Sequence, residues 1–463
     1  MKFLNFEKYT YLKEKHKDYL KELADYVQTS KYLPKFHIYP QTGLMNDPNG
    51  LAYFNGEYQI FYQWFPFEPS HGMKHWARVT SKDLTEWEWQ GPALIPDREY
   101  EKNGCYSGNA IEKDGKLYLF YTANYKIGDN DRIPKQAVAF MEKDGSIKKY
   151  ENNPVINGAP EGFTGDIRDP FVFEKNGSYY MLLGGKTQKN EGKLLIYKSE
   201  NLLKWDYFGV LDIGIENIGY MYECPNYIEV DGKDVLVFSP MGLEPQGDRY
   251  HNQFTSLYMI GKLDIENRKF HVEFMDEIDC GFDFYAPQVF YGKNKKPLMF
   301  GWFGCGEQVL PTDREMWRHG LTMARELYIK NGKLYTKPIK EIDSKYKKEN
   351  LFECLNCKIK NKYYLIDETI EKQEKPVILQ FGTNDDNWKL IIDFKKSKIT
   401  FDRNGLAQKF DTKYGLTRSC SIEKSDKVHI KIYVDNSFVE ICVNEGERMM
   451  SGRIFFMQEE NDV

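Results

Sequence analysis

The sequence predicts an all-β protein: a five-bladed β-propeller followed by a C-terminal β-sandwich, with a short helix at the N-terminus. The first observation is a repeat, because a hairpin-turn signal recurs five times at intervals of 55 to 62 residues. The second is the alternation of apolar and polar residues on both sides of these turns, which is typical of strands. Repeats of this length that are rich in short strands fit the four-stranded blades of a propeller.

Two sequence markers define the repeat. The hairpin signals are Asn55-Gly56, Asp114-Gly115, Asn176-Gly177, Asp231-Gly232 and, at the fifth place, Gly292-Lys293-Asn294. Such dipeptides favour two-residue turns between antiparallel strands. The second marker is Ser81 to Trp87, which recurs as Ser199 to Trp205 after 118 residues, the length of two repeats.

The other elements flank the propeller, which we expect over residues 34–338. Apolar residues between Leu12 and Val27 follow helical spacing and Pro34 ends the pattern, so residues 1–33 are predicted to be a helical segment, with the helix over 9–27. The charged stretch 339–350 is the expected linker. Residues 351–463 contain period-two runs such as Val428 to Val434, which fit two sheets packed face to face in a sandwich.

Composition excludes several classes of partner. The 463 residues are 41% hydrophobic and 15% aromatic, enough for a large core, and 64 basic against 69 acidic residues leave a net charge of -5 with no long run of either sign. We therefore expect no nucleic-acid partner and no membrane partner. The N-terminus lacks the apolar core of a signal peptide, so a cytoplasmic location is expected. Association of copies through the sandwich stays open.

The cysteines also fit a cytoplasmic protein. Eight cysteines spread over the chain are expected to be reduced core thiols. Cys354 and Cys357 are the one close pair, but no second pair accompanies them, so a structural role is favoured over zinc. His71 and His75 have a spacing that would bind zinc on a helix, and this segment does not have a helical pattern. We expect no metal and no cofactor.

Three carboxylates occupy similar places in the repeat. Asp47, Asp169 and Glu223 precede their hairpin signals by seven or eight residues, and Ser107 holds the same place in the second repeat. Each acid has a structural alternative: Asp47 in a tight turn, Asp169 as a turn cap, Glu223 as an edge acid. Because equivalent places in a propeller face the central axis, the convergence of all three favours a site.

Such a site is suited to acid–base or nucleophilic catalysis on a neutral polar substrate. Two carboxyl groups that flank a glycosidic bond are the usual equipment for glycoside hydrolysis. Aromatic rings, on which the C–H faces of sugars pack, crowd the same segments. They are Tyr39, Phe61, Tyr62, Trp64, Trp76, Tyr106, Tyr222 and Trp302.

Several motifs, in order along nearly the whole chain from about residue 34, resemble those of glycoside hydrolase family 32, which contains invertases, levanases and sucrose-6-phosphate hydrolases. They are His37, Leu44 to Gly50, Phe61 to Gln63, Tyr106 to Ala110, Arg168 to Pro170, Tyr222 to Pro225, Asp283 to Gln288, Gly301-Trp302, Pro311 to Asp313, Trp317 to Thr322 and Arg325 to Leu327. The resemblance implies a five-bladed propeller joined to a sandwich, which agrees with the repeat count.

The resemblance also implies roles. Asp47 would be the nucleophile, Glu223 the acid/base and Asp169 the acid that holds fructosyl hydroxyls and stabilises the transition state. The family's sugar-binding positions match Asn46, Gln63, Tyr106, Ser107 and Arg168, and we add the rings of Trp76 and Trp302. The family's Trp-Gly-His-Ala stretch is Trp76 to Val79 here, a departure that bears on substrate preference.

The expected reaction is the hydrolysis of sucrose-6-phosphate, and of sucrose, through a covalent fructosyl-enzyme, by a retaining β-fructofuranosidase. The absent signal peptide favours the phosphorylated sugar, and the segment His71 to Trp76 is similar to that of phosphate-using members. Lys74 would offer the phosphate a charge, and His71 or His75 a hydrogen bond; the alternative for Lys74 is a solvated surface lysine. A fructan hydrolase, a fructosyltransferase and a non-catalytic fructoside-binding protein remain alternatives; the presence of all three acids argues against the last.

Overall fold

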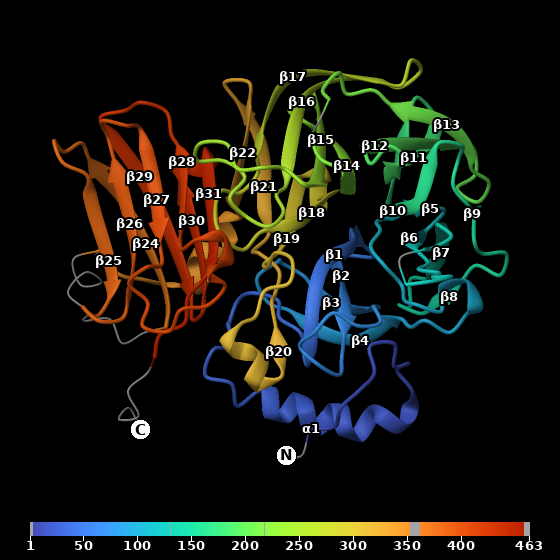
Figure 1. The fold of residues 1–463 in the computed structure, drawn as a ribbon, viewed down its shortest axis with the longest axis horizontal. Coiled ribbons are helices and arrows are strands. Elements are labelled where there is room, and N and C mark those ends of the chain that lie inside the picture. Colours follow the sequence, from blue (N-terminus) through green and yellow to red (C-terminus); the bar gives the residue numbers. More distant parts are fainter. Residues whose placement is uncertain (1–2, 130, 217, 352–361, 458–463) are drawn as a thin grey trace.

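The computed structural model describes residues 3–129, 131–216, 218–351 and 362–457, and Cys354 and Cys357 lie outside these ranges. The described chain is built almost entirely of strands, in seven sheets, with one α-helix, α1 (Lys17–Val27). Figure 1 shows two sheets of the C-terminal part at the left and the earlier sheets at the right, with α1 below them. An all-β fold with a short N-terminal helix is therefore confirmed.

Five sheets follow one another along residues 43–338, and each consists mainly of strands joined in sequence order. The first contains β1 (Gly43–Phe54), β2 (Glu57–Phe65), β3 (His75–Ser81) and β4 (Glu88–Leu94), with β20 (Trp317–Arg318) parallel to β1. The second contains β5 (Ala110–Lys113), β6 (Lys116–Thr122), β7 (Lys135–Met141) and β8 (Ile147–Lys149), with β9 (Ile156–Asn157) on β7.

The next three sheets each have four strands. The third contains β10 (Phe163–Lys175), β11 (Ser178–Thr187), β12 (Gly192–Ser199) and β13 (Asp206–Leu211). The fourth contains β14 (Met221–Val230), β15 (Lys233–Met241), β16 (Leu257–Asp264) and β17 (Lys269–Glu277). The fifth contains β18 (Tyr285–Tyr291), β19 (Pro297–Trp302), β21 (Arg325–Lys330) and β22 (Lys333–Pro338).

The predicted hairpin turns are confirmed in the first four sheets. Asn55 and Gly56 join β1 to β2 with φ angles of 54° and 86°, and Asp114-Gly115, Asn176-Gly177 and Asp231-Gly232 likewise have two positive φ angles. Two consecutive positive φ angles define the turn whose twist matches that of the flanking strands, and Asn, Asp and Gly tolerate them best. In the fifth sheet a 3₁₀ turn, Lys293–Lys295, joins β18 to β19.

The second repeat marker also forms the same local structure twice. The backbone N–H of Leu84 donates to Oγ of Ser81 at 2.8 Å between β3 and β4, and Leu202 donates to Ser199 at 2.9 Å between β12 and β13. Both leucines are buried with positive φ, 66° and 69°. The sequence repeat therefore encodes a repeated turn that covers the core of its sheet.

Hydrogen bonds link the first strands of the five sheets in a closed series. Asn49 accepts from Gly108 N at 3.2 Å and Asn109 accepts from Val172 N at 2.8 Å. The third and fourth sheets are linked by Cys224 N, which donates to Asp169 at 3.0 Å, and the fourth and fifth by Val289 N, which donates to Asn226 at 3.1 Å. Leu51 N in β1 donates to Gln288 in β18 at 3.0 Å, which joins the last sheet to the first.

A β-bulge recurs in four of these first strands, at a proline. The register shifts fall between Met45 and Pro48, Arg168 and Phe171, Glu223 and Asn226, and Tyr285 and Gln288, around Pro48, Pro170, Pro225 and Pro287. Proline has no N–H to give to a strand ladder, so a bulge accommodates it. A bulge bends the strand and redirects its side chains.

The N-terminal helix is shorter than predicted. A 3₁₀ turn, Glu14–His16, leads into α1, and residues 9–13 are not helical. The reason is tertiary: Met73 N donates to Lys8 O at 2.7 Å, and the Phe6 ring stacks on Phe67 with centroids 4.3 Å apart. These contacts hold the preceding segment in an extended path along the first sheet.

Two further sheets form the C-terminal part and share one apolar core. One contains β23 (Lys347–Lys348), β24 (Tyr363–Glu371), β29 (Lys427–Asp435), β30 (Phe438–Val443) and β31 (Arg448–Arg453). The other contains β25 (Val377–Gly382), β26 (Asn387–Asp393), β27 (Lys398–Asp402) and β28 (Thr417–Ser421). The stretch 339–350 forms a 3₁₀ turn, Lys340–Lys345, and then β23, which pairs with β24.

A buried ionic cluster ties the C-terminal sheets to the earlier ones. Arg325 of β21 donates through Nη2 to Glu440 of β30 at 2.6 Å and lies 2.9 Å from Asp279. His37 lies between Asp435 and Glu440, at 2.7 and 3.0 Å. Burial lowers the pKa of His37, but these two carboxylates outweigh burial and raise it. The two carboxylates therefore favour the protonated form of the ring.

Candidate active site

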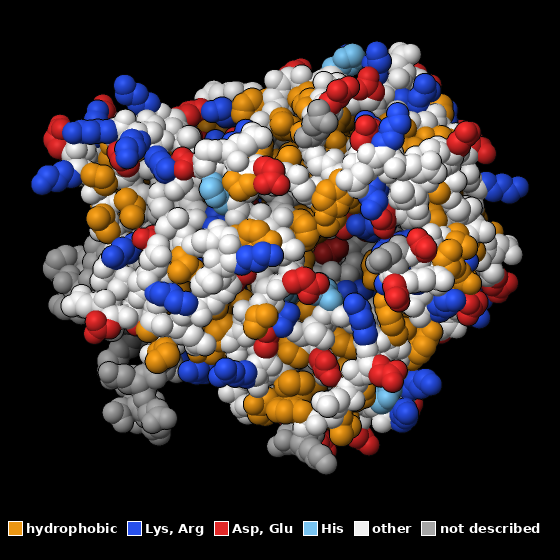
Figure 2. Space-filling model, in the orientation of Figure 1, with side chains coloured by type: hydrophobic (Ala, Val, Ile, Leu, Met, Phe, Trp, Pro, Cys, Tyr) orange, Lys and Arg blue, Asp and Glu red, His pale blue; other side chains and the backbone are white. Residues whose placement is uncertain are grey.

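A cavity of about 450 Å³ opens at the ends of β1, β10 and β14 and contains all three predicted acids. Figure 2 shows a hollow near the centre of one face, with an acidic side chain at its bottom and basic and histidine side chains at its rim. Asp47 comes from β1, Asp169 from β10 and Glu223 from β14. Three separate sheets therefore contribute one carboxylate each.

Asp47 accepts hydrogen bonds mainly from neutral donors. Ser107 Oγ donates a short hydrogen bond to Oδ2, Asn46 Nδ2 donates to Oδ1 at 3.1 Å, and Gln63 Nε2 lies 3.4 Å from Oδ2. Burial raises the pKa of Asp47, the Ser107 hydrogen bond opposes this, and the negative charge of Glu223 adds to the rise. The donors fix the direction of the carboxylate while leaving it facing the cavity.

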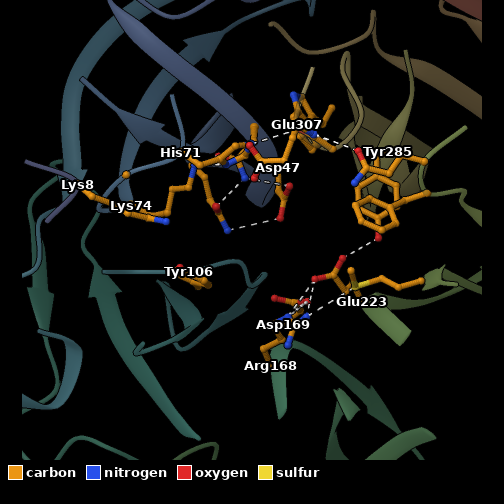
Figure 3. A pocket seen from close by; sticks show the side chains of 18 of the residues that line it. Lys8, Asp47, His71, Lys74, Tyr106, Arg168, Asp169, Glu223, Tyr285 and Glu307 are labelled. Atoms are coloured by element: carbon orange, nitrogen blue, oxygen red, sulfur yellow. Dashed lines mark hydrogen bonds and ion pairs between the residues drawn. The ribbon is translucent and has the colours of Figure 1, made fainter. Parts of the chain in front are cut away.

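Glu223 is held at both of its oxygens. Arg168 donates to Oε1 through Nε at 3.0 Å and Nη2 at 2.7 Å, and Tyr285 Oη donates to Oε2 at 2.6 Å. Burial lowers the pKa of Arg168, but the carboxylates of Glu223, Asp169 and Asp166 outweigh it, so the pKa is raised and the guanidinium stays charged. In Figure 3, Glu223 faces Asp47 across the cavity.

Asp169 is the most buried of the three acids, with 5% of its surface exposed. Its Oδ2 accepts from Cys224 N at 3.0 Å, and its own backbone N–H donates to Thr122 Oγ1 at 2.8 Å. Burial raises the pKa of Asp169 to about 7; Arg168 opposes the rise, while the charges of Glu223 and Asp47 add to it. This carboxyl therefore titrates near neutrality.

The structure shows that the three acids do not hold equivalent positions in their strands. Measured from the bulge proline, Asp47 and Asp169 both immediately precede it, but Glu223 stands two residues before Pro225, and Cys224 holds the place next to the proline. Glu223 therefore corresponds to Asn46 and Arg168. The count back from the hairpin signal missed this because β1 has one more residue between its proline and its turn.

Lys74 and His71 lie beside Asn46 at one end of the cavity. Lys74 Nζ donates to Asn46 Oδ1 at 2.7 Å and lies 3.1 Å from His71 Nδ1. Lys74 is only 4% exposed, and burial lowers its pKa to about 7 against the opposing charges of Asp47 and Glu307. Burial and the neighbouring Lys74 charge lower the pKa of His71, which keeps its ring neutral.

The other predicted sugar-binding residues divide into two groups. Asn46, Gln63, Tyr106, Arg168 and Trp302 line the cavity. Ser107 and Trp76 do not, which differs from the sequence expectation. Ser107 lies behind Asp47, and Trp76 is fully buried in the core between the first two sheets, where its Nε1 donates to Tyr106 O at 2.9 Å. Trp76 thus supports Tyr106 from behind because β3 directs its ring inward.

Sequence reasoning missed several lining residues. Tyr285 lies within the motif Asp283 to Gln288, which assigned it no role, and its bond to Glu223 depends on the bulge in β18. Lys8 and Tyr9 come from the N-terminal segment, and no periodicity marks them. The remaining lining residues are Gly72, Lys126, Arg132, Met241, Gln253, Phe254, Gly306 and Glu307, which lie mostly in loops.

The described ranges contain neither a metal-binding cluster nor a membrane-spanning helix. In them, no group of three or more His, Cys, Asp or Glu side chains is placed to hold a metal ion. Within the same ranges, α1 included, no helix has the length and apolar character needed to cross a membrane.

Comparison with known proteins identifies a matching protein family. The family model described as "Glycosyl hydrolases family 32 N-terminal domain" matches residues 37–338, and "Glycosyl hydrolases family 32 C terminal" matches residues 333–463. A sucrose-6-phosphate hydrolase of Staphylococcus xylosus is 38% identical over 94% of this chain and 90% of its own, and one of Bacillus subtilis is 36% identical over 91% and 88%.

Solved structures agree with this. The sucrose-6-phosphate hydrolase of Lactobacillus gasseri superposes with a TM-score of 0.90 at 33% identity, over 97% of this chain and 94% of the other. A β-fructofuranosidase of Bombyx mori in complex with sucrose gives 0.79 at 30% identity, over 96% and 94%. With both family models matched in order and the acids gathered in one cavity, the chain belongs to glycoside hydrolase family 32.

Proposed function

We propose that this chain is a retaining β-fructofuranosidase that hydrolyses sucrose-6-phosphate, and sucrose, to fructose and glucose-6-phosphate or glucose. Membership of a glycoside hydrolase family supports the reaction class. The similarity of the chain to sucrose-6-phosphate hydrolases supports the substrate. The observation that carries the proposal is the pair of carboxylates, Asp47 and Glu223, which reach one cavity from different strands with different hydrogen-bond partners.

The two carboxylates divide the work. Asp47, oriented by Ser107 and Asn46, attacks the anomeric carbon of the fructosyl unit while the glycosidic bond breaks. Glu223 gives its proton to the departing glycosidic oxygen. Because Arg168 occupies Oε1, that proton sits on Oε2, beside Tyr285. In the second step a water molecule gives its proton to Glu223 and its oxygen to the anomeric carbon, and Asp47 is released.

Asp169 and the lining side chains hold the fructosyl unit. Cys224 N satisfies one oxygen of Asp169, so the other is free to accept hydrogen bonds from sugar hydroxyls. Arg168 lies 3.9 Å from Asp169 and offsets part of its charge. Asn46, Gln63, Tyr106, Trp302, His71 and Lys74 surround the same space and complete the proposed sugar-binding set.

The proposed architecture is a five-bladed propeller followed by a sandwich, with domain bounds of 34–338 and 351–463. The closed series of hydrogen bonds from the first sheet to the fifth and back supports it. So does a small cavity that residues of all five sheets surround, among them Pro48, Gly108, Pro170, Pro225 and Pro287. A central axis explains why the active-site acids converge.

The test is an assay of the purified protein on sucrose-6-phosphate and on sucrose, with methanol added as a second acceptor. A retaining enzyme forms methyl β-fructoside alongside fructose, because methanol intercepts the covalent intermediate on the same face as water. Methyl α-fructoside would contradict retention. Absence of any turnover would favour a binding protein, and chains longer than the substrate at high sucrose would favour a fructosyltransferase.

A further inference from the structure

The N-terminal arm, defined here as residues 3–12, reaches the proposed active site although it precedes every sheet. Phe6 stacks on Phe67, and its backbone N–H donates to Glu68 at 3.1 Å. Met73 N, next to Lys74, donates to Lys8 O at 2.7 Å, and Tyr11 Oη donates to Lys102 O at 3.0 Å. The arm is therefore fixed at several points, and Lys8 and Tyr9 become part of the cavity wall.

Lys8 brings a positive charge that the protein does not neutralise. Among the described residues, Lys8 takes part in no ion pair and no side-chain hydrogen bond. Its charge acts on the cavity, since it lowers the pKa of Lys74 and of His71, after the larger effect of burial. Figure 3 shows Lys8, Lys74 and His71 together at the side of the cavity away from Glu223 and Tyr285.

The other cations of the cavity already have partners. Lys74 donates to Asn46 and is almost completely buried, Arg132 lies 3.4 Å from Asp166, and Arg168 holds Glu223. Lys126 donates to Asp129 O at 3.3 Å and lies 5.7 Å from the centre of the Tyr9 ring. Lys8, by contrast, is solvent-exposed at the mouth, where a group on the outer end of a substrate would sit.

We propose that Lys8 binds the phosphate of the phosphorylated substrate, so that the N-terminal arm sets the preference for phosphorylated over plain sucrose. The inference rests on the proposed function. An ammonium is a point charge that suits a dianion and needs no fixed fork geometry. Lys126, which lies over the Tyr9 ring of the arm, supplies a second, weaker charge. Lys74 keeps its place at Asn46 and contacts the sugar rather than the phosphate.

The test compares Lys8→Met with the wild type on sucrose-6-phosphate and on sucrose. We expect kcat/KM on the phosphorylated sugar to fall about ten- to a hundredfold, the cost of one charge-assisted contact, and kcat/KM on sucrose to change less than about twofold. Lys8→Arg should restore at least half of the lost preference. Lys15→Met is the matched control: it removes an exposed lysine from the 3₁₀ turn that follows the arm and does not line the cavity, so both activities should stay unchanged.

Product inhibition provides a second readout that needs no turnover of the variant on phosphorylated substrate. With sucrose as substrate, glucose-6-phosphate should inhibit Lys8→Met at least ten times more weakly than the wild type, whereas inhibition by fructose should be unchanged. Equal losses on both substrates, or unchanged inhibition, would overturn the role of Lys8. A wild type that favours plain sucrose would instead overturn the proposed substrate, so the two failures are distinguishable.

Discussion

Arg168 donates two hydrogen bonds to the same oxygen of Glu223, Oε1, through Nε at 3.0 Å and Nη2 at 2.7 Å. In the proposed mechanism the catalytic proton is therefore carried by Oε2, whose partner is the hydroxyl of Tyr285. One oxygen of Glu223 thus contacts a cation and the other a neutral hydroxyl. Asp47, with its amide and hydroxyl donors, has no such division. The first prediction tests this difference.

Glu223→Gln should lose about 10²- to 10⁴-fold in kcat/KM on sucrose-6-phosphate, because it cannot protonate the leaving group. On a β-fructoside with a good leaving group the loss should be at least tenfold smaller, and fructosyl-enzyme should accumulate, since water lacks its base. Mass spectrometry of the quenched protein would detect the fructosyl group on Asp47. Asp47→Asn is the control and should lose activity equally on both substrates; equal losses for Glu223→Gln would remove Glu223 from the acid role.

Removal of the Lys74 charge should shift the acid limb of the pH profile. Activity requires ionised Asp47, whose pKa is raised first by burial and is lowered by the hydrogen bond from Ser107 and by the charge of Lys74. On an activated fructoside, Lys74→Met should therefore move the acid limb of kcat/KM to higher pH, whereas Glu223→Gln should leave it in place, because a protonated Glu223 carries no charge to remove. A shift to lower pH with Lys74→Met would contradict the assignment of this limb to Asp47.

Lys74→Met should lower kcat/KM on sucrose and on sucrose-6-phosphate alike, by about tenfold. Lys74 fixes Asn46, which in turn donates to Asp47, so its removal disturbs the nucleophile whatever the substrate carries. The sequence alone suggested a loss confined to the phosphorylated sugar. The ratio of kcat/KM on sucrose-6-phosphate to kcat/KM on sucrose distinguishes the two possibilities. A ratio that falls with Lys74→Met would show that Lys74, and not Lys8, binds the phosphate.

Asp169→Asn should stabilise the protein at alkaline pH while abolishing most activity. The pKa of Asp169 in the folded protein, about 7, lies above the ordinary value of 3.8, so the cost of ionising this carboxyl grows as pH rises between these values and is fully present above pH 7. The gain in unfolding free energy should reach at most about 4 kcal/mol at pH 8. It should nearly vanish below pH 4. Thermal unfolding at pH 4, 6 and 8 would measure it; a gain that is independent of pH would contradict the raised pKa.

Arg325→Met should destabilise the junction between the C-terminal sheets and the rest by about 3–5 kcal/mol, because it removes the cation beside the buried carboxylate of Asp279 and leaves Glu440 paired with His37 alone. Lys337→Met is the matched control. Its pair with Glu445 crosses the same junction at 3.0 Å but is partly exposed, so its loss should cost less than about 1 kcal/mol. Similar losses in denaturant unfolding for the two variants would contradict the importance of burial.

The sequence by itself determined the repeat and the identity of the acids. Asn55-Gly56 and its counterparts fix local turns through their own backbone preferences, so the hairpins could be predicted without knowledge of the rest of the chain. The same holds for the turn at Ser81, where the hydroxyl bonds its own neighbours. Asp47, Asp169 and Glu223 were found because the repeat gave them similar positions.

Tertiary structure decided what those positions do. The bulges at Pro225 and its counterparts place Glu223 in register with Arg168, a shift of one residue that spacing from the turn does not reveal. Contacts between segments far apart in sequence removed Trp76 from the cavity and brought Lys8 into it. Turn preferences are local properties of adjacent residues, so they can be predicted from the sequence. The lining of a cavity depends on packing between sheets, which the order of residues along the chain does not reveal.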